Sequence, residues 1–434
     1  MKTAIIGGAG VRTPLLVHGL VSAGLPITTV SLFDPDRQRL TVIGRLVERL
    51  SPAISLDIAD TPEAAIAGSR IVFTSIRVGG LERRARDEAA CLALGVLGQE
   101  TVGAAGFAMA MRTIPEMVRY ARQVAAHAPD AWIVNFTNPV GIITQAVLER
   151  TGRPVNIVGI CDTPEELFES VAATLDLPRA DCAFDYVGLN HLGWLRRVLH
   201  EGRDRLQDLW NDPGRIARIY RAPLFDPARL ADARLLPTEY VYYYEHPDRA
   251  VSRLREAGRT RAGSIVALTD TLFTDLASPA VDPVAAYRAY LHARSAGYMQ
   301  IEAGDTGSSR EERWTDPSGY ARIAIEVCRG LLGGAPVTLA LDVENLGNLP
   351  TLAPHDVVEV PSVVGRFGVL PLHTGGLPAA VAPTVEAVKH YERLTIEAAA
   401  TGSRASARAA LAANPLIPDA GLAERLLDAL EVIQ

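Results

Sequence analysis

Residues 2–14, Lys-Thr-Ala-Ile-Ile-Gly-Gly-Ala-Gly-Val-Arg-Thr-Pro, decide the fold of this chain. The first five form a short apolar strand pattern, Gly7, Gly8 and Gly10 mark a turn, and an apolar helical pattern follows. In this context glycines let a pyrophosphate approach the backbone N–H groups at a helix N-terminus. Thr13 stands where the usual motif has its third glycine, so a purely structural turn is the alternative.

The next strand strengthens the prediction of a dinucleotide site. The run Ser-Leu-Phe-Asp at 31–34 ends with an acid, placed where such folds accept hydrogen bonds from the adenosine ribose hydroxyls. Asp34 therefore favours NAD over NADP, whose additional phosphate it would repel, while Arg37 and Arg39 moderate that preference. The alternative is that Asp34 only caps the following helix.

Short apolar segments alternate with amphipathic helical segments through the first half of the chain. The expected strands include residues 30–33, 71–74, 132–136 and 156–160, and the expected helices include residues 14–23, 36–50, 107–126 and 139–150. This alternation predicts a parallel α/β sheet. Ligands of such sheets gather at the carboxyl ends of the strands.

The pattern changes after about residue 184. A strand-rich stretch at 185–199 is followed by several helices and by strand-like segments at 337–343 and 357–364. We therefore predict an α/β protein with an N-terminal Rossmann-like dinucleotide-binding domain at residues 1–180. A C-terminal mixed α+β domain at residues 181–434 follows, with an approximate boundary, and the two form one compact unit.

Composition narrows the class of protein. The chain has 434 residues, of which 48% are hydrophobic and 21% charged, enough for a large core. Its net charge of -7 argues against nonspecific binding to nucleic acid. The four cysteines are scattered without CxxC pairs, which fits a reducing cytoplasm, and no apolar run is long enough to span a bilayer. We expect a cytoplasmic protein with no nucleic-acid or membrane partner.

Cys161 and His191 are candidate metal ligands. Each ends an apolar strand-like run, so both side chains could point into one cleft, where a thiolate and an imidazole can bind a divalent metal. Their softness favours zinc or iron over manganese. The alternatives are a buried core cysteine and a structural histidine. Asp162 is a candidate acid catalyst, and its place before a Thr-Pro pair equally suits the first residue of a helix.

Ordered motifs along nearly the whole chain carry a family resemblance. They are Ile-Arg-Val-Gly-Gly-Leu-Glu-Arg-Arg at 76–84, Gly-Gln-Glu-Thr at 98–101, Met-Arg-Thr-Ile-Pro at 111–115, Asn-Phe-Thr-Asn-Pro at 135–139, Gly-Leu-Asn-His-Leu at 188–192, Leu-Pro-Thr-Glu-Tyr at 236–240, Thr-Arg-Ala at 260–262 and Val-Glu-Val-Pro at 358–361. Together they resemble glycoside hydrolase family 4. The 76–115 block and the Gly-Leu-Asn-His-Leu form look most like the 6-phospho-β-glucosidases of that family.

The resemblance implies hydrolysis with tightly held NAD and a divalent metal, usually Mn²⁺. By analogy, NAD oxidises the sugar C3 hydroxyl, a protein base removes the acidified C2 hydrogen, and the metal stabilises the resulting charge. Elimination of the C1 leaving group, addition of water and return of the hydride complete a redox-neutral hydrolysis.

Matching positions give roles to individual residues. The resemblance makes Cys161 and His191 the metal ligands and Tyr240 the base, with Tyr242 or Tyr243 as the fallback. A tyrosine base needs a lowered pKa, which a nearby metal or cation provides. On its own, Tyr240 would suggest a stripe of aromatic packing.

Further positions match contacts to the sugar or its phosphate. Arg84, Asn138, Asn190 and Arg261 are the predicted substrate contacts, and Asn138 is also a predicted cofactor contact. A guanidinium group suits phosphate recognition, although a single arginine is usually a solvated surface charge. Glu100 is a candidate for a sugar contact or for a place just behind one.

Two departures from the family pattern bear on substrate preference. The N-terminal loop lacks the commoner Gly-Gly-Gly-Ser start, and Arg12 is the candidate that compensates for lost contacts. Residue 162 is Asp, as is frequent in α-specific members, where β-specific members often carry Asn. The remaining motifs cover more residues and favour the β reading.

We therefore expect a homodimer or homotetramer that hydrolyses a phosphorylated disaccharide or glucoside, as a 6-phospho-β-glucosidase. The alternatives within the family are a 6-phospho-α-glucosidase and a glycosidase of unphosphorylated sugars. An NAD-dependent hydroxy-acid dehydrogenase would instead accumulate NADH. A non-catalytic NAD-sensing protein would bind the nucleotide without turnover.

Overall fold

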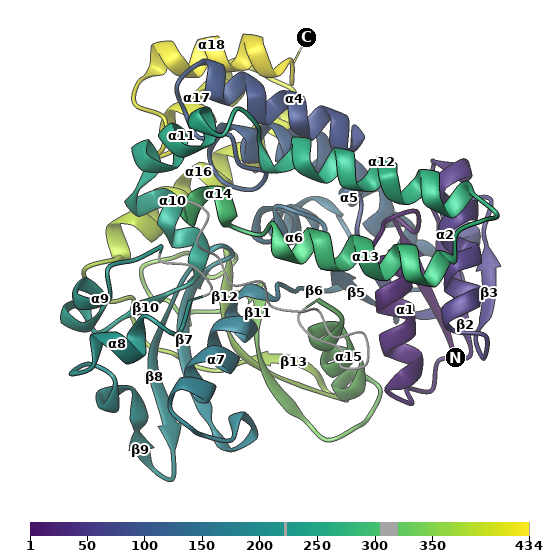
Figure 1. Ribbon diagram of the computed structural model, residues 1–434, viewed down its shortest axis with the longest axis horizontal. Coiled ribbons are helices and arrows are strands. Elements are labelled where there is room, and N and C mark those ends of the chain that lie inside the picture. The colour runs from purple at the N-terminus through teal and green to yellow at the C-terminus, as the bar shows by residue number, and fades with distance from the viewer. Residues whose placement is uncertain (221–223, 304–319, 434) are drawn as a thin grey trace.

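One mixed sheet organises the part of the chain that this computed structural model describes, which is residues 1–220, 224–303 and 320–433 (Figure 1). The strand order is β10-β8-β7-β12-β11-β6-β5-β4-β1-β2-β3, with β13 paired to β12 and β9 to β8. The strands are β1 Lys2–Ile6, β2 Thr29–Phe33, β3 Ser55–Ile58, β4 Ser69–Thr74, β5 Trp132–Asn135, β6 Asn156–Gly159, β7 Ala183–Leu189, β8 Leu192–His200, β9 Arg203–Asp204, β10 Leu236–Pro237, β11 Val337–Glu344, β12 Val357–Gly365 and β13 Gly368–Pro371.

The N-terminal part of the sheet is parallel from β3 through β6. Its helices are α1 Thr13–Ser22, α2 Arg37–Leu50, α3 Pro62–Ile66, α4 Gly80–Ala93, α5 Gly103–His127 and α6 Val140–Arg150. This arrangement confirms the predicted Rossmann-like half. The expected strands at 132–136 and 156–160 each ran one residue too far, because Phe136 and Ile160 already lie in the loops that follow β5 and β6.

The C-terminal strands extend the same sheet in antiparallel fashion. Asp342 of β11 pairs with Gly159 of β6, so the sheet is continuous across residue 180, and the boundary there stays a prediction. The remaining helical elements of the chain are α7 Thr163–Thr174, η1 Arg179–Asp181, η2 Arg205–Asp208, α8 Pro213–Ile216, α9 Pro227–Ala233, η3 Glu239–Val241, α10 Tyr242–Glu245, α11 Pro247–Glu256, α12 Arg261–Ala277, α13 Pro283–Ala296, α14 Gln300–Ala303, α15 Tyr320–Leu331, α16 Ala382–Thr401, α17 Arg404–Ala413 and α18 Ala420–Leu430.

Helices α12 and α13 run side by side and reach back over the N-terminal half (Figure 1). Their anchor is Tyr287, which is fully buried, packs with Leu46 and Leu272, and donates a 2.7 Å hydrogen bond to the carbonyl of Val11 in the glycine loop. A segment from the second half therefore packs directly on the turn that the sequence associates with a dinucleotide. None of the helices in the described ranges has the length and apolar character that a transmembrane span requires.

Candidate active site

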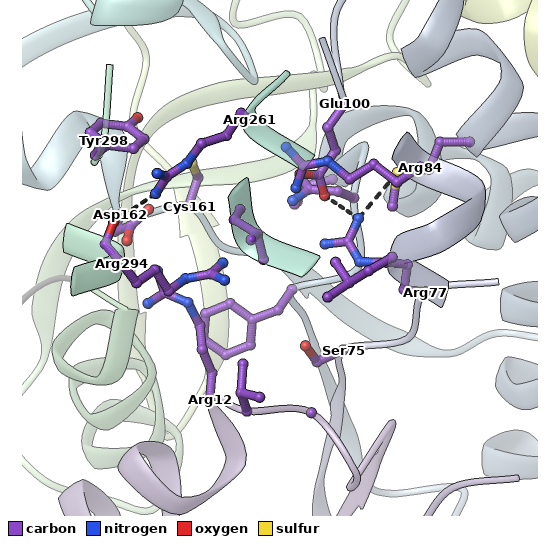
Figure 2. A pocket seen from close by; sticks show the side chains of 18 of the residues that line it. Arg12, Ser75, Arg77, Arg84, Glu100, Cys161, Asp162, Arg261, Arg294 and Tyr298 are labelled. Carbon is purple, nitrogen blue, oxygen red and sulfur yellow. Dashed lines mark hydrogen bonds and ion pairs between the residues drawn. The ribbon is translucent and has the colours of Figure 1, made fainter. Parts of the chain in front are cut away.

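A cavity of about 640 Å³ lies between the carboxyl ends of the parallel strands and the α12–α13 pair (Figure 2). It brings together most of the predicted site residues, namely Gly7, Gly10, Asp34, Arg84, Glu100, Asn138, Cys161, Asp162, His191, Tyr240, Tyr243 and Arg261. Gly8, Asn190 and Tyr242 are outside its lining.

The packing of the glycine loop explains why Gly8 does not line the cavity. Gly7 has φ +92°, and a Cβ there would lie 2.3 Å from the carbonyl oxygen of Ser75, so this turn requires glycine. A Cβ at Gly8 would lie 2.9 Å from Cβ of Leu32, so the residue allows close packing of the loop against β2. The cavity is reached by the backbone of Gly7 and Gly10.

Asp34 is held at the cavity by backbone donors. Its carboxylate accepts hydrogen bonds from the N–H groups of Ala9, at 3.2 Å, and Asp36, at 2.9 Å. Burial raises the pKa of Asp34, and these two hydrogen bonds oppose the shift. The reading of Asp34 as a helix cap is wrong, because Asp36 occupies the N-cap of α2 and accepts from the N–H of Arg39.

These features fit a dinucleotide without a 2′-phosphate. Arg37 donates to the carbonyl oxygen of Ala59 and pairs with Asp60 at 2.8 Å, and Arg39 lies over the ring of Phe273 at 4.9 Å. Both arginines are thus engaged by the protein, and an acid stands at the ribose position of the fold.

Asn138 offers a second contact point to a ligand. Its side-chain oxygen is buried and has no hydrogen-bond partner within the described residues, and the residue lines the cavity just before α6. Buried polar atoms are rarely left unpaired unless a ligand or water serves them. Asn135 in the same motif instead accepts hydrogen bonds from the hydroxyl of Thr74 and the N–H of Thr137, so it shapes the turn.

Cys161 and His191 lie next to each other in the lining of this cavity. The Sγ atom of Cys161 lies 3.5 Å from Nε2 of His191, and both residues are buried. On the other side of the ring, Nδ1 lies 2.8 Å from the hydroxyl of Thr101, which itself donates to Gln99 at 3.0 Å. The Thr101 oxygen must therefore accept the Nδ1 hydrogen, which leaves the Nε2 lone pair directed at Cys161.

The protonation of this pair is set by burial. Burial lowers the pKa of His191 to about 4, against the opposing effects of Asp162 and Glu100, so the imidazole is neutral at pH 7. Burial, together with Glu359 and Asp162, raises the pKa of the Cys161 thiol well above its usual value. The thiol therefore carries its proton at pH 7 unless a cation replaces it.

The donors fit a divalent metal that is shared with substrate. Thiolate sulfur and neutral imidazole nitrogen are both common metal ligands. Across residues 1–220, 224–303 and 320–433, no set of three or more His, Cys, Asp or Glu side chains is placed to hold an ion. Two protein ligands would leave the other coordination positions to oxygen atoms of substrate and water, as catalytic metal sites require.

Tyr240 stacks on the candidate metal ligand. Its ring is parallel to that of His191 within 6°, with centroids 3.7 Å apart, at the start of the Tyr-rich segment in η3 and α10. Burial raises the pKa of Tyr240, and a hydrogen bond with Tyr298 opposes the shift only in part. The lowered pKa that a base needs is therefore not supplied by the protein alone. The fallback Tyr243 donates its hydroxyl to Glu302 at 2.7 Å.

Asp162 stands at the N-cap of α7 but makes no side-chain capping hydrogen bond. Its position is that of a helix-start residue, yet its carboxylate is not used for capping. The residue lines the cavity next to Cys161, where a proton donor or acceptor could serve a bound ligand (Figure 2).

Arginines form two different groups in this cavity. On one side, Arg84 pairs with Glu88 at 2.7 Å and with Glu100, and Arg77 pairs with Glu100 at 2.5 Å (Figure 2). Although burial raises the pKa of Glu100, the two arginines hold it at about 2. The positive charge of Arg84 is thus largely matched by protein carboxylates.

The second group consists of Arg12, Arg261 and Arg294, and burial is the largest influence on the pKa of the last two. Arg261 donates to the backbone oxygen of Arg294 at 2.6 Å, and Arg294 donates to the hydroxyl of Tyr290 at 3.1 Å. Burial lowers the pKa of both; Arg294 and Arg84 add to the shift of Arg261, and Arg12 adds to that of Arg294. Such a cluster would be relieved by a bound anion. Arg294 lies in no motif, and only the packing of α13 reveals it.

The chain belongs to glycosyl hydrolase family 4. A family model described as family 4 glycosyl hydrolase matches residues 2–177, and the family 4 glycosyl hydrolase C-terminal domain matches residues 186–417. The resemblance inferred from the motifs is therefore confirmed.

Relatives of both stereochemical classes are similar along the whole chain. A probable 6-phospho-beta-glucosidase of Bacillus subtilis strain 168 is 28% identical over 99% of this chain and 95% of its own. The structure of the 6-phospho-beta glucosidase from Thermotoga maritima with NAD and glucose-6-phosphate has a TM-score of 0.84 and 28% identity, covering 99% and 97% of the two chains. A 6-phospho-alpha-glucosidase from gut microorganisms, in complex with NAD and Mn²⁺, has a TM-score of 0.81 and 25% identity, with the same coverage.

Proposed function

We propose that this chain is a 6-phospho-β-glucosidase that uses NAD and a divalent metal, Mn²⁺ first, and acts on a phosphorylated disaccharide or glucoside. The observation that carries the proposal is the 3.5 Å Cys161–His191 pair beneath Tyr240, in one cavity with the glycine loop and the arginine cluster. Relatives named as 6-phosphoglucosidases and solved with NAD, Mn²⁺ or glucose-6-phosphate support it. A cytoplasmic location and a homodimer or homotetramer stay predictions.

The glycine loop and Asp34 form the proposed NAD-binding part of the site. The N–H groups of the Gly7–Gly10 turn donate to protein acceptors, so the turn would serve NAD by letting its pyrophosphate approach the start of α1 closely. The side chains of Asp34 and Asn138 would contact the cofactor directly. Cys161 and His191 would hold the metal. Bound NAD supplies reversible hydride acceptance at the sugar C3, and the metal supplies positive charge next to oxygens that become negative.

The proton transfers fall to residues of this chain. Tyr240 takes the C2 proton on its phenolic oxygen, and its stacking on His191 keeps that oxygen beside the pair of ligands. The carboxyl group of Asp162 makes no capping hydrogen bond and lines the cavity, and it donates a proton to the departing C1 oxygen. Arg261, Arg294 and Arg12 bind the 6-phosphate, and the α12–α13 pair limits the access of water.

The preference for the β anomer rests on the motifs and the relatives, whereas Asp162 favours the 6-phospho-α-glucosidase alternative. Cellobiose and maltose phosphorylated at the non-reducing C6 separate the two when incubated with reduced protein, NAD and Mn²⁺ in D₂O. We expect cleavage of the cellobiose compound with deuterium at C2 of the released sugar, observed by NMR. Faster cleavage of the maltose compound would reverse the anomeric assignment. NADH accumulation would indicate a dehydrogenase, and nucleotide binding without turnover a sensor.

Metal affinity should depend on pH through Cys161. The raised thiol pKa means that metal binding must release one proton, while His191 is already neutral above about pH 4. Affinity for Mn²⁺ is therefore expected to rise by about tenfold per pH unit between pH 6 and 8. Electron paramagnetic resonance of free Mn²⁺ measures this slope. Cys161→Ser serves as the control, because its residual affinity should be nearly independent of pH; an equal slope in both proteins would contradict the thiol as the source.

The Arg294→Ala variant should lose activity mainly on phosphorylated substrates. Loss of one charge-assisted contact to phosphate is expected to reduce kcat/KM for the phosphorylated glucoside by roughly 10- to 100-fold, with little change for the unphosphorylated sugar. Arg261→Ala should behave alike. Arg322→Ala is the matched control, since that residue lines the same cavity but is held by Glu169 at 2.7 Å. Equal losses for both sugars would reject the phosphate role.

A further inference from the structure

Glu359 occupies the middle of the sheet beneath the Cys161–His191 pair. In the register of the sheet, Asp342 faces Glu359 between β11 and β12, and Glu359 faces Gly188 between β12 and β7. Glu359 is only 1% exposed. It therefore lies directly beside the strand end that leads to His191.

The two candidate ligands come from strands that are not neighbours. Cys161 follows β6 and His191 follows β7, and β11 and β12 separate these strands. With strands about 4.8 Å apart, the axes of β6 and β7 are roughly 14 Å apart, yet Sγ and Nε2 approach to 3.5 Å. The turn that carries His191 must lean across the sheet, and His191 adopts φ +62°, a left-handed conformation that His tolerates better than most residues other than glycine.

The carboxylate of Glu359 holds that turn in place through two hydrogen bonds. One oxygen accepts a 2.6 Å hydrogen bond from the hydroxyl of Tyr186, and the other accepts a 3.1 Å bond from the side-chain amide of Asn190. A Cβ at Gly193 would lie 1.9 Å from the Tyr186 hydroxyl, so this glycine makes room for the first bond. The strand before the turn and the residue next to His191 are thus tied to the same carboxyl group.

We propose that Glu359 is a positioning residue for the metal site and that it acts on His191 through Asn190. The Asn190 amide points to Glu359 rather than into the cavity, so its role is to hold the turn, not to contact the sugar. Among the described residues, the bond to Glu359 is the side-chain hydrogen bond that fixes Asn190, and its loss would free the left-handed turn to relax. The inference rests on the proposed role of His191 as a metal ligand.

The test compares Mn²⁺ affinity among variants at one fixed pH, by electron paramagnetic resonance, with NAD affinity and the circular-dichroism melting temperature measured alongside. Asn190→Ala and Glu359→Ala are each expected to weaken Mn²⁺ binding by about 10- to 100-fold and to leave NAD affinity unchanged. Glu359→Gln should bind Mn²⁺ markedly better than Glu359→Ala, because its carbonyl can accept from Asn190 while its amide donates to Tyr186. Asn190 is half-buried, so Asn190→Ala keeps the test valid even if Glu359→Ala unfolds.

The double variant and a matched control identify the route. The double variant Glu359→Ala/Asn190→Ala should have the same Mn²⁺ affinity as the single variant with the larger loss, because both substitutions break the same hydrogen bond. Tyr186→Phe removes the hydrogen bond to the other carboxylate oxygen and should affect Mn²⁺ binding less. Additive losses, or wild-type Mn²⁺ affinity with a raised KM in Asn190→Ala, would overturn the inference. Wild-type Mn²⁺ affinity in His191→Ala would instead remove the metal assignment on which the inference rests.

Discussion

Cys161→Ser is expected to lower Mn²⁺ affinity by more than about a hundredfold, beyond the range seen for residues that only orient ligands. The Sγ atom faces the free Nε2 lone pair of His191 at 3.5 Å, so its replacement removes one of two protein donors. A serine hydroxyl does not ionise near neutral pH and cannot replace a thiolate. Turnover should fall with metal affinity, whereas NAD binding should persist, since the glycine loop and Asp34 are separate elements.

Titration of free Mn²⁺ by electron paramagnetic resonance gives the affinity, and quenching of tryptophan fluorescence follows NAD. Cys182→Ser is the matched control. That cysteine is half-buried, donates weakly to the carbonyl oxygen of Pro178 at 3.4 Å and does not line the cavity, so its variant should resemble wild type. Undiminished metal affinity in Cys161→Ser would remove this residue from the ligand set.

Tyr240→Phe is expected to reduce turnover by about 10²- to 10⁴-fold, the range of a lost general base. The phenylalanine ring can keep the stacking on His191, so metal affinity and folding should be preserved. Because burial raises the Tyr240 pKa, the hydroxyl depends on a nearby cation to become a base. The variant should therefore also lose the incorporation of deuterium at C2 of the sugar in D₂O.

Tyr243→Phe separates the base from its neighbours. Its hydroxyl also belongs to the cavity region but donates to Glu302, so its loss should leave C2 exchange largely intact. Wild-type C2 exchange in Tyr240→Phe, or loss of exchange only in Tyr243→Phe, would transfer the role to the fallback residue.

Local periodicity was sufficient for the parallel half of the fold but not for its continuation. The strands from β1 to β6 follow one another with a helix between them, so apolar patterns predict most of these elements and their parallel pairing. The short strand β3, whose side chains are partly exposed, was not among the named predictions. The pairing of β11 with β6 joins Asp342 to Gly159 across most of the second half of the chain. No spacing in the sequence encodes such a contact, and the strands were therefore expected in a separate α+β unit.

The same limit applies to the site. Strand ends and motifs pointed to Asp34, Asn138, Cys161 and His191, which do reach the cavity. Motif membership does not reveal the direction of a side chain, so the motif that predicted Asn190 as a sugar contact did not indicate its hydrogen bond to Glu359. The sugar contact itself stays a prediction. Arg294 lies in a helix without any motif, and only tertiary packing identifies it.

The continuity of the sheet has a thermodynamic consequence. Because β6 and β11 are neighbours, the two halves share one sheet. The contacts between β6 and β11 therefore contribute to the free energy of folding of both halves. Separation near residue 180 would leave β6 paired only with β5, as an edge strand with one open side, the kind of surface on which chains associate. Heating should accordingly melt both halves in one cooperative transition, and the N-terminal half expressed alone should aggregate rather than persist as an isolated nucleotide-binding unit.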